Sequence, residues 1–263
     1  MASMSDETSS RKNDWLTMVA VSALACILQD VLHEGLGHGV TAWLSGAHQI
    51  TMSTVALQSD IETRWVSANG TLVNLATAAI LWLLLLRQRY RPVTHYFLVL
   101  ALAGNLFTGT GYFLFSGVAN FGDWKQVIAG LQPQWAWRVG LIVLGASSYY
   151  ASMLLVATKL RPFQGREPRI LRWVCWTPYF TDGVLAGIAA LFSPLGLFYM
   201  IASALPSTLG ANSGLLGLPS MMCRGEHKEE GIVILRSIPW IVAAAIASAF
   251  FIVVLGHGIT WSR

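Results

Sequence analysis

The sequence predicts an all-α membrane protein, a polytopic bundle of six to seven transmembrane helices. Of its 263 residues, 54% are hydrophobic and only 11% are charged, whereas soluble domains carry about 25% charged residues. The mean hydropathy of +0.55 points the same way. This composition excludes a disordered chain and argues against a water-soluble globule. We therefore expect a helical bundle whose partner is the lipid bilayer.

Seven segments are long and apolar enough to be transmembrane helices, which need about 20 mostly apolar residues. They cover residues 15–44, 65–86, 94–116, 135–158, 173–192, 195–217 and 237–258. The fifth and sixth are separated only by the sequence Ser-Pro-Leu-Gly, which predicts either a tight hairpin or a kink within one element. Residues 203–214 are polar for a membrane span and fit a re-entrant segment. The count therefore stays between six and seven.

The chain is predicted to form one transmembrane domain, residues 15–263, after a disordered tail. Residues 1–14 are polar, which is typical of a disordered segment. Residues 15–44 are too long and too charged for a signal-peptide core, so we interpret them as a retained span. The three cysteines, Cys26, Cys175 and Cys223, form no CxxC pair. They indicate neither a disulfide framework nor a thiolate metal site.

The positions of the basic residues predict the orientation in the membrane. With seven spans and a cytoplasmic N-terminus, most of the 17 Lys and Arg residues lie in cytoplasmic segments, as the positive-inside rule requires. Merging the fifth and sixth spans weakens this asymmetry. The chain is therefore predicted to be an integral protein of the cell membrane. Its net charge of +4 is interpreted as anchoring to anionic lipid and not as a sign of a nucleic-acid partner.

The first predicted span contains four ionisable residues, Asp30, His33, Glu34 and His38. Their offsets place them along one side of a helix, facing the interior of the bundle. Ionisable groups are costly inside a membrane and usually serve a function. Two neutral imidazoles can bind Zn²⁺, and a neighbouring Glu can take a proton from the metal-bound water. The pattern favours metal binding over a proton or ion relay, and over a purely structural hydrogen-bonded network.

The run LHEGLGHGVTAWLSG, residues 32–46, resembles the HExxH helix of site-2-protease-type intramembrane zinc metalloproteases. The resemblance covers this helix well and the rest of the chain loosely. It implies that His33 and His38 bind Zn²⁺ and that Glu34 is the catalytic general base. It also implies that the substrate is a membrane protein or a juxtamembrane peptide.

The histidine spacing departs from that family, which has its two histidines at i and i+4. Here His33 and His38 are at i and i+5, which on an ideal helix turns the second ring about 140° from the first, against about 40° for i+4. A π-bulge accommodates one inserted residue through its i→i+5 bonding. The glycines Gly35, Gly37 and Gly39 supply the backbone freedom. We therefore predict a distorted helix that brings both imidazoles together.

A competing model keeps this helix regular. Asp30, Glu34 and His38 are spaced i, i+4 and i+8 and would then form a carboxylate-rich site. In that arrangement Glu34 is a metal ligand, and the similarity to a protease weakens.

The resemblance also implies a third metal ligand, an Asp from a later span. Asp182 lies in PYFTDG, residues 178–183, and is closer in letters to the DG signature of the family. Asp123 lies in FSGVANFGDW, residues 115–124, and is better placed in depth, because His38 and Asp123 both fall toward the outer ends of their spans. The sequence favours Asp123 and leaves Asp182 open.

Residues 67–86 carry a partial match to a second family motif, AGPxxN. Asn69-Gly70 followed by Asn74 resembles it, with Thr71 where the family has Pro. We predict that Asn74 hydrogen-bonds either the substrate backbone or a neighbouring helix. The run 104–117, rich in Gly and Thr, predicts close helix packing or the wall of a cleft.

These observations lead to a zinc metallopeptidase as the predicted function, with Glu34 as catalytic base and His33, His38 and Asp123 as zinc ligands. Two alternatives stay open. The stripe of ionisable residues would also suit a metal or proton translocator, and the extra residue between the histidines would also suit a protein that is folded like the proteases but inactive.

Overall fold

The structure is a computed structural model that describes residues 12–87, 90–165, 167–193, 205–222 and 231–262. The all-α prediction is confirmed, with one small sheet added to the helices. Most of the predicted N-terminal tail, and residues 195–204 of the sixth predicted span, lie outside the described residues.

The first predicted span is confirmed as one continuous helical segment, Trp15–Leu44. It consists of α1 (Trp15–Val31), the π-helix η1 (Leu32–Gly39) and α2 (Val40–Leu44). Asp14 caps its beginning, because the Asp14 carboxylate accepts a hydrogen bond of 2.8 Å from the backbone N–H of Thr17.

Five helical segments of the described chain are long and apolar enough to cross a membrane. Besides the first, they contain α3 (Arg64–Leu85), α4 (Pro92–Ala119), α6 (Gln134–Leu160) with the 3₁₀ turn η2 (Arg161–Phe163), and α10 (Ile238–Phe250) with the π-helical turn η6 (Phe251–Leu255). They correspond to the predicted spans 65–86, 94–116, 135–158 and 237–258. The chain is consistent with an integral membrane protein.

The predicted count of six to seven spans is not confirmed. The fifth predicted span corresponds to α7 (Pro168–Ala190), which is less apolar than the five segments above. The described part of the sixth is broken into η4 (Pro206–Gly210), η5 (Ala211–Ser213) and α9 (Gly214–Met222). Polar and glycine residues in 206–214 interrupt the apolar run, which accounts for the breaks.

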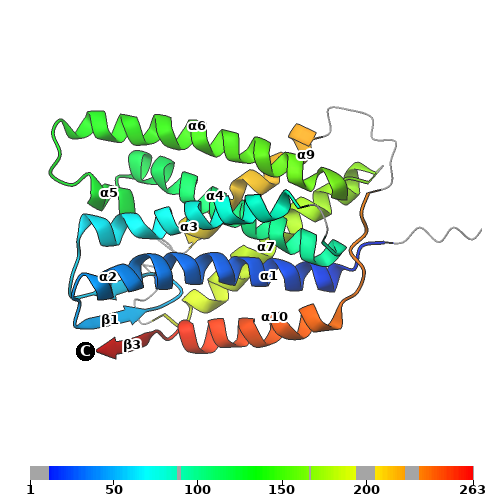
Figure 1. Cartoon of the computed structure of the whole chain (residues 1–263), viewed down its shortest axis with the longest axis horizontal. Helices are drawn as coiled ribbons and strands as arrows, with labels where there is room; N and C mark the ends of the chain where they lie inside the picture. Colours follow the sequence, from blue (N-terminus) through cyan, green and yellow to red (C-terminus); the bar gives the residue numbers. More distant parts are fainter. Residues whose placement is uncertain (1–11, 88–89, 166, 194–204, 223–230, 263) are drawn as a thin grey trace, which may run out of the picture.

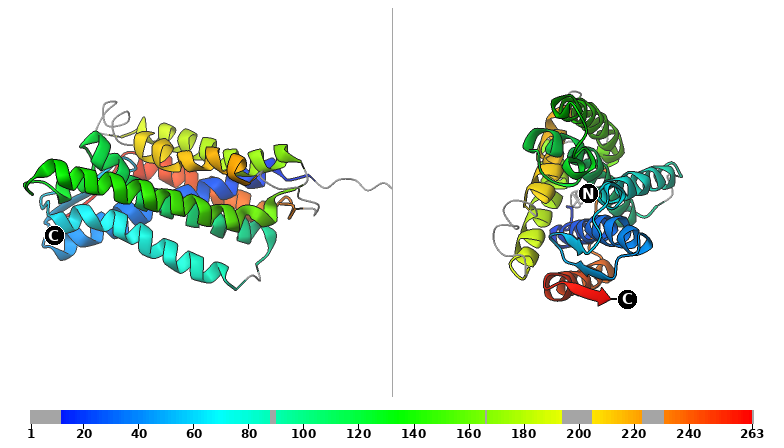
Figure 2. Two further views of the ribbon diagram at one scale, coloured as in Figure 1. Left: turned by 90° about the horizontal axis from the view of Figure 1, so that it is seen from above. Right: turned by 90° about the vertical axis from the view of Figure 1, so that its left-hand side faces the viewer.

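Helix α4 lies at the centre of the bundle, between α6 at one edge and α10 at the other (Figures 1 and 2). In its most apolar stretch 67% of the residues are buried, against 22% for Gln134–Phe163 and 17% for Ile238–Leu255. The outer helices expose large apolar side chains such as Val143, Leu144, Val242 and Ile246. Such surfaces are costly in water but suit contact with lipid.

A proline inside α7 is accommodated by a side chain of α4. Pro178 has no N–H to donate, so the carbonyl of Val174 lacks its helical partner. The hydroxyl of the fully buried Tyr96 donates to that carbonyl at 2.7 Å. The α4–α7 contact therefore satisfies a backbone group that lipid could not.

A small antiparallel sheet lies at the end of the bundle where α2 and α5 (Asp123–Val127) also lie (Figure 1). Its strands are β1 (Gln49–Met52), β2 (Leu57–Ser59) and β3 (Ile259–Ser262), in the order β2-β1-β3. Ile50 pairs with Ser59 on one side and with Trp261 on the other. The side chain of Met52 packs against Gly35, where an added Cβ would lie 3.3 Å from the Met52 sulfur. The sheet therefore supports the π-helix from outside the bundle.

Candidate metal centre

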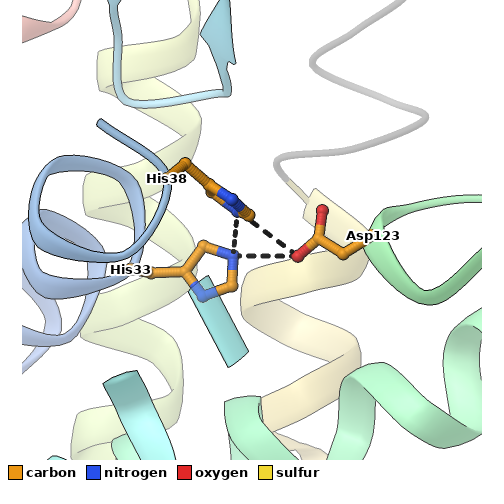
Figure 3. Close-up of side chains that lie close together, drawn as sticks. All are labelled: His33, His38 and Asp123. Carbon is orange, nitrogen blue, oxygen red and sulfur yellow. Dashed lines mark hydrogen bonds and ion pairs between the residues drawn. The ribbon is translucent and has the colours of Figure 1, made fainter. Parts of the chain in front are cut away.

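Three side chains that the sequence predicted as metal ligands meet at one point (Figure 3). His33 Nε2 lies 3.2 Å from His38 Nε2 and 3.2 Å from Asp123 Oδ2, and His38 Nε2 lies 3.4 Å from the same oxygen. Both histidines are buried, and Asp123 is partly exposed. Within the described residues, this is the group of His, Cys, Asp and Glu side chains whose donor atoms could hold a metal ion.

The π-helix brings the two imidazoles together. Residues Leu32–Gly39 form i→i+5 hydrogen bonds, and the last is donated by the Val40 N–H to the Gly35 carbonyl. The sequence prediction of a distorted helix is therefore confirmed. The competing model, a regular helix with a site of Asp30, Glu34 and His38, is wrong, because the wider π turn stacks residues five apart on one face.

Asp123 reaches the histidines because the chain turns sharply after α4. Asn120 ends the helix in the left-handed conformation (φ 53°), and Gly122 has φ 83°, a value that residues with a Cβ rarely adopt. The guanidinium of Arg138 donates to the carbonyls of Gly117 and Val118 at 3.0 Å each, which fixes the end of α4. Asp123 is then the first residue of α5.

Hydrogen bonds on the far side of each ring set the histidine tautomers. His33 Nδ1 lies 2.6 Å from Asn74 Oδ1, and His38 Nδ1 lies 2.7 Å from the Val66 carbonyl oxygen. The Val66 carbonyl is an acceptor only, so His38 Nδ1 carries the proton. The amide of Asn74 donates through Nδ2 elsewhere, so its Oδ1 also accepts from His33. In neutral rings, both Nε2 lone pairs therefore point at the site.

The three donor atoms of the site are arranged so that a positive charge between them would be stabilised. Two Nε2 lone pairs and the Asp123 carboxylate face one another, and Asp123 Oδ2 is buried with no hydrogen-bond partner among the described residues. A proton on one imidazole or a metal ion would fill this position. Burial raises the pKa of the Asp123 carboxyl, but attraction to the two imidazoles in their protonated form outweighs burial and holds that pKa below its ordinary value. The donor set, two imidazoles and one carboxylate, fits a metal ion.

Asn74 is fully buried, and its amide makes contacts within the chain. It accepts from His33 and donates to Asn105 Oδ1 at 2.8 Å and to the Gln29 carbonyl at 3.3 Å. Asn105 in turn donates to the Ala101 carbonyl. These contacts favour the helix–helix polar contact that the sequence allowed beside substrate binding. Partners of this kind orient a metal-binding imidazole and increase its basicity.

Glu34, the predicted general base, is buried. It follows His33 directly in the sequence, but it is not one of the three residues that converge at the site. The residue is 7% exposed, and its Oε2 atom has no hydrogen-bond partner among the described residues. Asp30, one turn earlier in the segment, also holds a buried oxygen without such a partner. An unpaired buried carboxylate is costly, and it is available to interact with a molecule that enters the site.

Asp182, the other candidate for a third ligand, lies elsewhere in the bundle. It is buried on α7 and accepts a hydrogen bond of 3.3 Å from Asn212 Nδ2 of η5. The structure therefore brings Asp123, and not Asp182, to the two histidines.

Two residues near the site were not predicted as part of it. Gly70 of α3 packs directly against both imidazoles, since an added Cβ would lie 2.8 Å from His33 Cε1 and 2.6 Å from His38 Cε1. The ring of Tyr112 on α4 lies 4.9 Å from that of His33, at an angle of 32°. Gly70 belongs to the partial AGPxxN match and Tyr112 to the Gly- and Thr-rich run, so both motifs carried a signal.

Replacing Gly70 by Ala is expected to lower metal affinity about 10- to 100-fold, because the new methyl group would displace both imidazoles. Metal titration of the purified protein measures the effect. Gly140→Ala is the matched control, since no atom lies within 4 Å of a Cβ at that helical position. Equal affinity of the Gly70→Ala and Gly140→Ala variants would show that the site is not where these contacts place it.

Comparisons with known proteins add no relative. The chain matched no protein-family model, no curated protein and no solved structure. The functional argument therefore depends on the geometry of the site and on the sequence pattern.

Proposed function

We propose that this protein is an intramembrane zinc metallopeptidase that hydrolyses a peptide bond of a membrane or juxtamembrane substrate. The observation that carries the proposal is the convergence of His33 Nε2, His38 Nε2 and Asp123 Oδ2. The hydrogen bonds to Asn74 and to the Val66 carbonyl place the proton of each neutral ring on Nδ1, which leaves both Nε2 atoms available to bind a metal. Three protein ligands with a further position open to water are typical of catalytic zinc and not of structural zinc.

The donor atoms support zinc over harder cations. Calcium and magnesium prefer oxygen ligands, and here two of the three donors are imidazole nitrogens. When bound, zinc would supply a Lewis acid that polarises a carbonyl and lowers the pKa of water to about 7.

Glu34 is proposed as the general base. It follows His33 directly, and its buried Oε2 has no hydrogen-bond partner among the described residues. A carboxylate in that state can accept a proton from the attacking water and later donate it to the leaving amine. Asn74 and the Val66 carbonyl keep the two histidine rings in position, and Asp123 provides the negative charge that balances the site.

The substrate is proposed to reach the site near the outer membrane surface. The candidate site lies at the end of the bundle that holds the sheet and α5, opposite the beginning of α1 (Figure 1). With a cytoplasmic N-terminus in the cell membrane, as the basic residues predict, this end faces outward. A helical substrate would have to unwind locally to expose its amide.

Removing the metal is expected to abolish peptide hydrolysis. The probe is a fluorescently labelled single-span peptide mixed with the purified protein in detergent micelles. Treatment with 1,10-phenanthroline should stop cleavage, and added Zn²⁺ should restore it, because zinc is the group proposed to polarise the carbonyl. Cleavage that persists after zinc has been removed would contradict the proposal.

A second candidate function, translocation of a metal ion or a proton, is supported by one observation. Asp30 and Glu34 each hold a buried carboxylate oxygen without a hydrogen-bond partner among the described residues, and they lie one turn apart. Such a pair could relay a cation along the first segment.

A further inference from the structure

A second buried polar site lies deeper in the bundle than the candidate metal centre. It is a cavity of about 10 Å³ where α1, α4, α7 and η5 meet, which is room for about one water-sized occupant. Its polar lining comes from Ser22, Cys26 and Gln29 of α1, Asp182 of α7 and Asn212 of η5. The remaining lining residues are apolar or glycine.

Two oxygen atoms in this lining lack hydrogen-bond partners. Asn212 Nδ2 donates to Asp182 Oδ2 at 3.3 Å, which leaves Oδ1 of each side chain. Both Oδ1 atoms are buried and have no hydrogen-bond partner in the described part of the chain. The two residues are 6% and 1% exposed. The thiol of Cys26 lies beside the Asp182 carboxyl, but a thiol is a weak donor and does not replace a full hydrogen bond.

Leaving these oxygens unsatisfied would be costly. A buried acceptor without a partner destabilises the fold, and a charged one does so more strongly. No Lys, Arg or His lines the cavity, so no side chain of the lining can neutralise an ionised Asp182. Both costs disappear if a small cation lies in the cavity, because it would bind both oxygens and balance the charge.

We propose that this cavity binds one Na⁺ ion, held by Asp182 Oδ1 and Asn212 Oδ1. A single carboxylate matches the charge of a monovalent ion. The ligands available are hard oxygen atoms, and Ser22 and Gln29, which also line the cavity, carry further oxygen atoms in their side chains. The small volume suits an ion that has lost most of its water.

Other occupants fit less well. Calcium takes six to eight oxygen ligands, and Mg²⁺ keeps several waters, for which a cavity of about 10 Å³ has no room. Among the described residues, Asp182 and Cys26 belong to no group of three His, Cys, Asp or Glu donors, which disfavours a transition metal. A water molecule would satisfy both oxygens but would not balance an ionised Asp182, and a proton on Asp182 is the alternative that the test below separates.

The site is separate from the metal centre, but both take residues from the first helical segment, Trp15–Leu44. The side chain of Gln29 lines the cavity, and its backbone carbonyl accepts from Asn74, which in turn accepts from His33. Ion binding would therefore stabilise the packing of α1 against α7 and η5. The proposal does not depend on the proposed peptidase function.

The test compares thermal unfolding of the purified protein, zinc-loaded and in detergent, in NaCl and in choline chloride at equal ionic strength. We expect Na⁺ to raise Tm saturably, on the order of 5 °C. Asp182→Asn should remove the Na⁺ dependence while keeping an acceptor for Asn212. Thr108→Val is the matched control, because it also removes a buried oxygen that has no hydrogen-bond partner in the described chain, but Thr108 does not line the cavity. It should leave the Na⁺ dependence in place.

Equilibrium dialysis with radioactive sodium provides a second measurement for the case that Asp182→Asn fails to fold. One ion bound per chain of the wild-type protein, displaced by unlabelled Na⁺, would support the site. Equal Tm values in NaCl and choline chloride, or no saturable binding of sodium, would overturn it. A Tm that follows pH but not Na⁺ would mean that a proton fills the site, and would also overturn it.

Discussion

Replacing Glu34 by Gln is expected to lower peptide hydrolysis by about 10²- to 10⁴-fold, the usual contribution of a general base. Gln has nearly the same shape but does not accept a proton from water. Because Glu34 lies outside the three-donor group, the metal content of the variant should stay the same. Cleavage of the labelled single-span peptide and metal analysis of the same preparation measure the two quantities together.

The same variant separates the candidate functions. If the protein is a carrier that holds its cation on carboxylates, Glu34→Gln should lose metal affinity. If it is an inactive protein with a protease-like fold, neither the wild type nor the variant should cleave the peptide. Wild-type turnover in the Glu34→Gln variant, with zinc bound, would contradict the assignment of Glu34 as the base.

Replacing Asp123 by Asn is expected to lower zinc affinity by about 10²- to 10⁴-fold. Zinc bound to small protein sites contributes about 10–16 kcal/mol, so the loss of one ligand in three should cost about 3–5 kcal/mol, at 1.4 kcal/mol per tenfold change. Asn also lacks the negative charge that balances the site. Competition with a zinc-binding dye measures the affinity.

Asp182→Asn is the matched control for this experiment, because the sequence offered Asp182 as the other third ligand. Since Asp182 pairs with Asn212 away from the histidines, its substitution should leave zinc affinity unchanged. The reverse pattern, with zinc lost on changing Asp182 and kept on changing Asp123, would show that the functional site differs from the one described.

The distorted first helix could be predicted because the constraint was local. Two histidines five residues apart can bind one metal ion only if the helix between them is distorted, and the glycines at 35, 37 and 39 permit that distortion. Gly37 is also required for a second reason, the close packing of η1 against α3, which the sequence alone did not reveal. An added Cβ there would lie 2.5 Å from the Cα of Gly70. This close approach of η1 and α3 brings Gly70 against the imidazoles, and no spacing rule within one segment predicts such a contact.

Features that depend on contacts distant in sequence were harder to predict. The sheet joins residues 49–59 with residues 259–262. None of its three short strands is distinguishable by hydropathy in such an apolar sequence. Asp123 was preferred from its depth in the membrane, whereas its position depends on the turn at Asn120 and Gly122. The sequence around Asp182 resembled the family motif more closely, yet Asp182 forms its hydrogen bond with Asn212 and does not contact the histidines. Motif letters were therefore a weaker guide here than depth.

A single number of spans could not be predicted, because the chain between α7 and α10 has a mixed composition. Polar and glycine residues interrupt the apolar run there. A transmembrane span, a re-entrant segment and a kinked helix would therefore give similar hydropathy patterns. Between α7 and α10, the described residues contain the short turns η4 and η5 and the nine-residue helix α9, and no further long apolar helix.

The most direct test of the central claim is X-ray absorption spectroscopy of the purified protein, combined with its metal content. We expect one zinc ion per chain, with nitrogen and oxygen ligands at about 2.0–2.2 Å and scattering typical of two imidazoles. Protein that retains no metal after purification in zinc, or a spectrum dominated by sulfur at about 2.3 Å, would contradict a centre built from His33, His38 and Asp123.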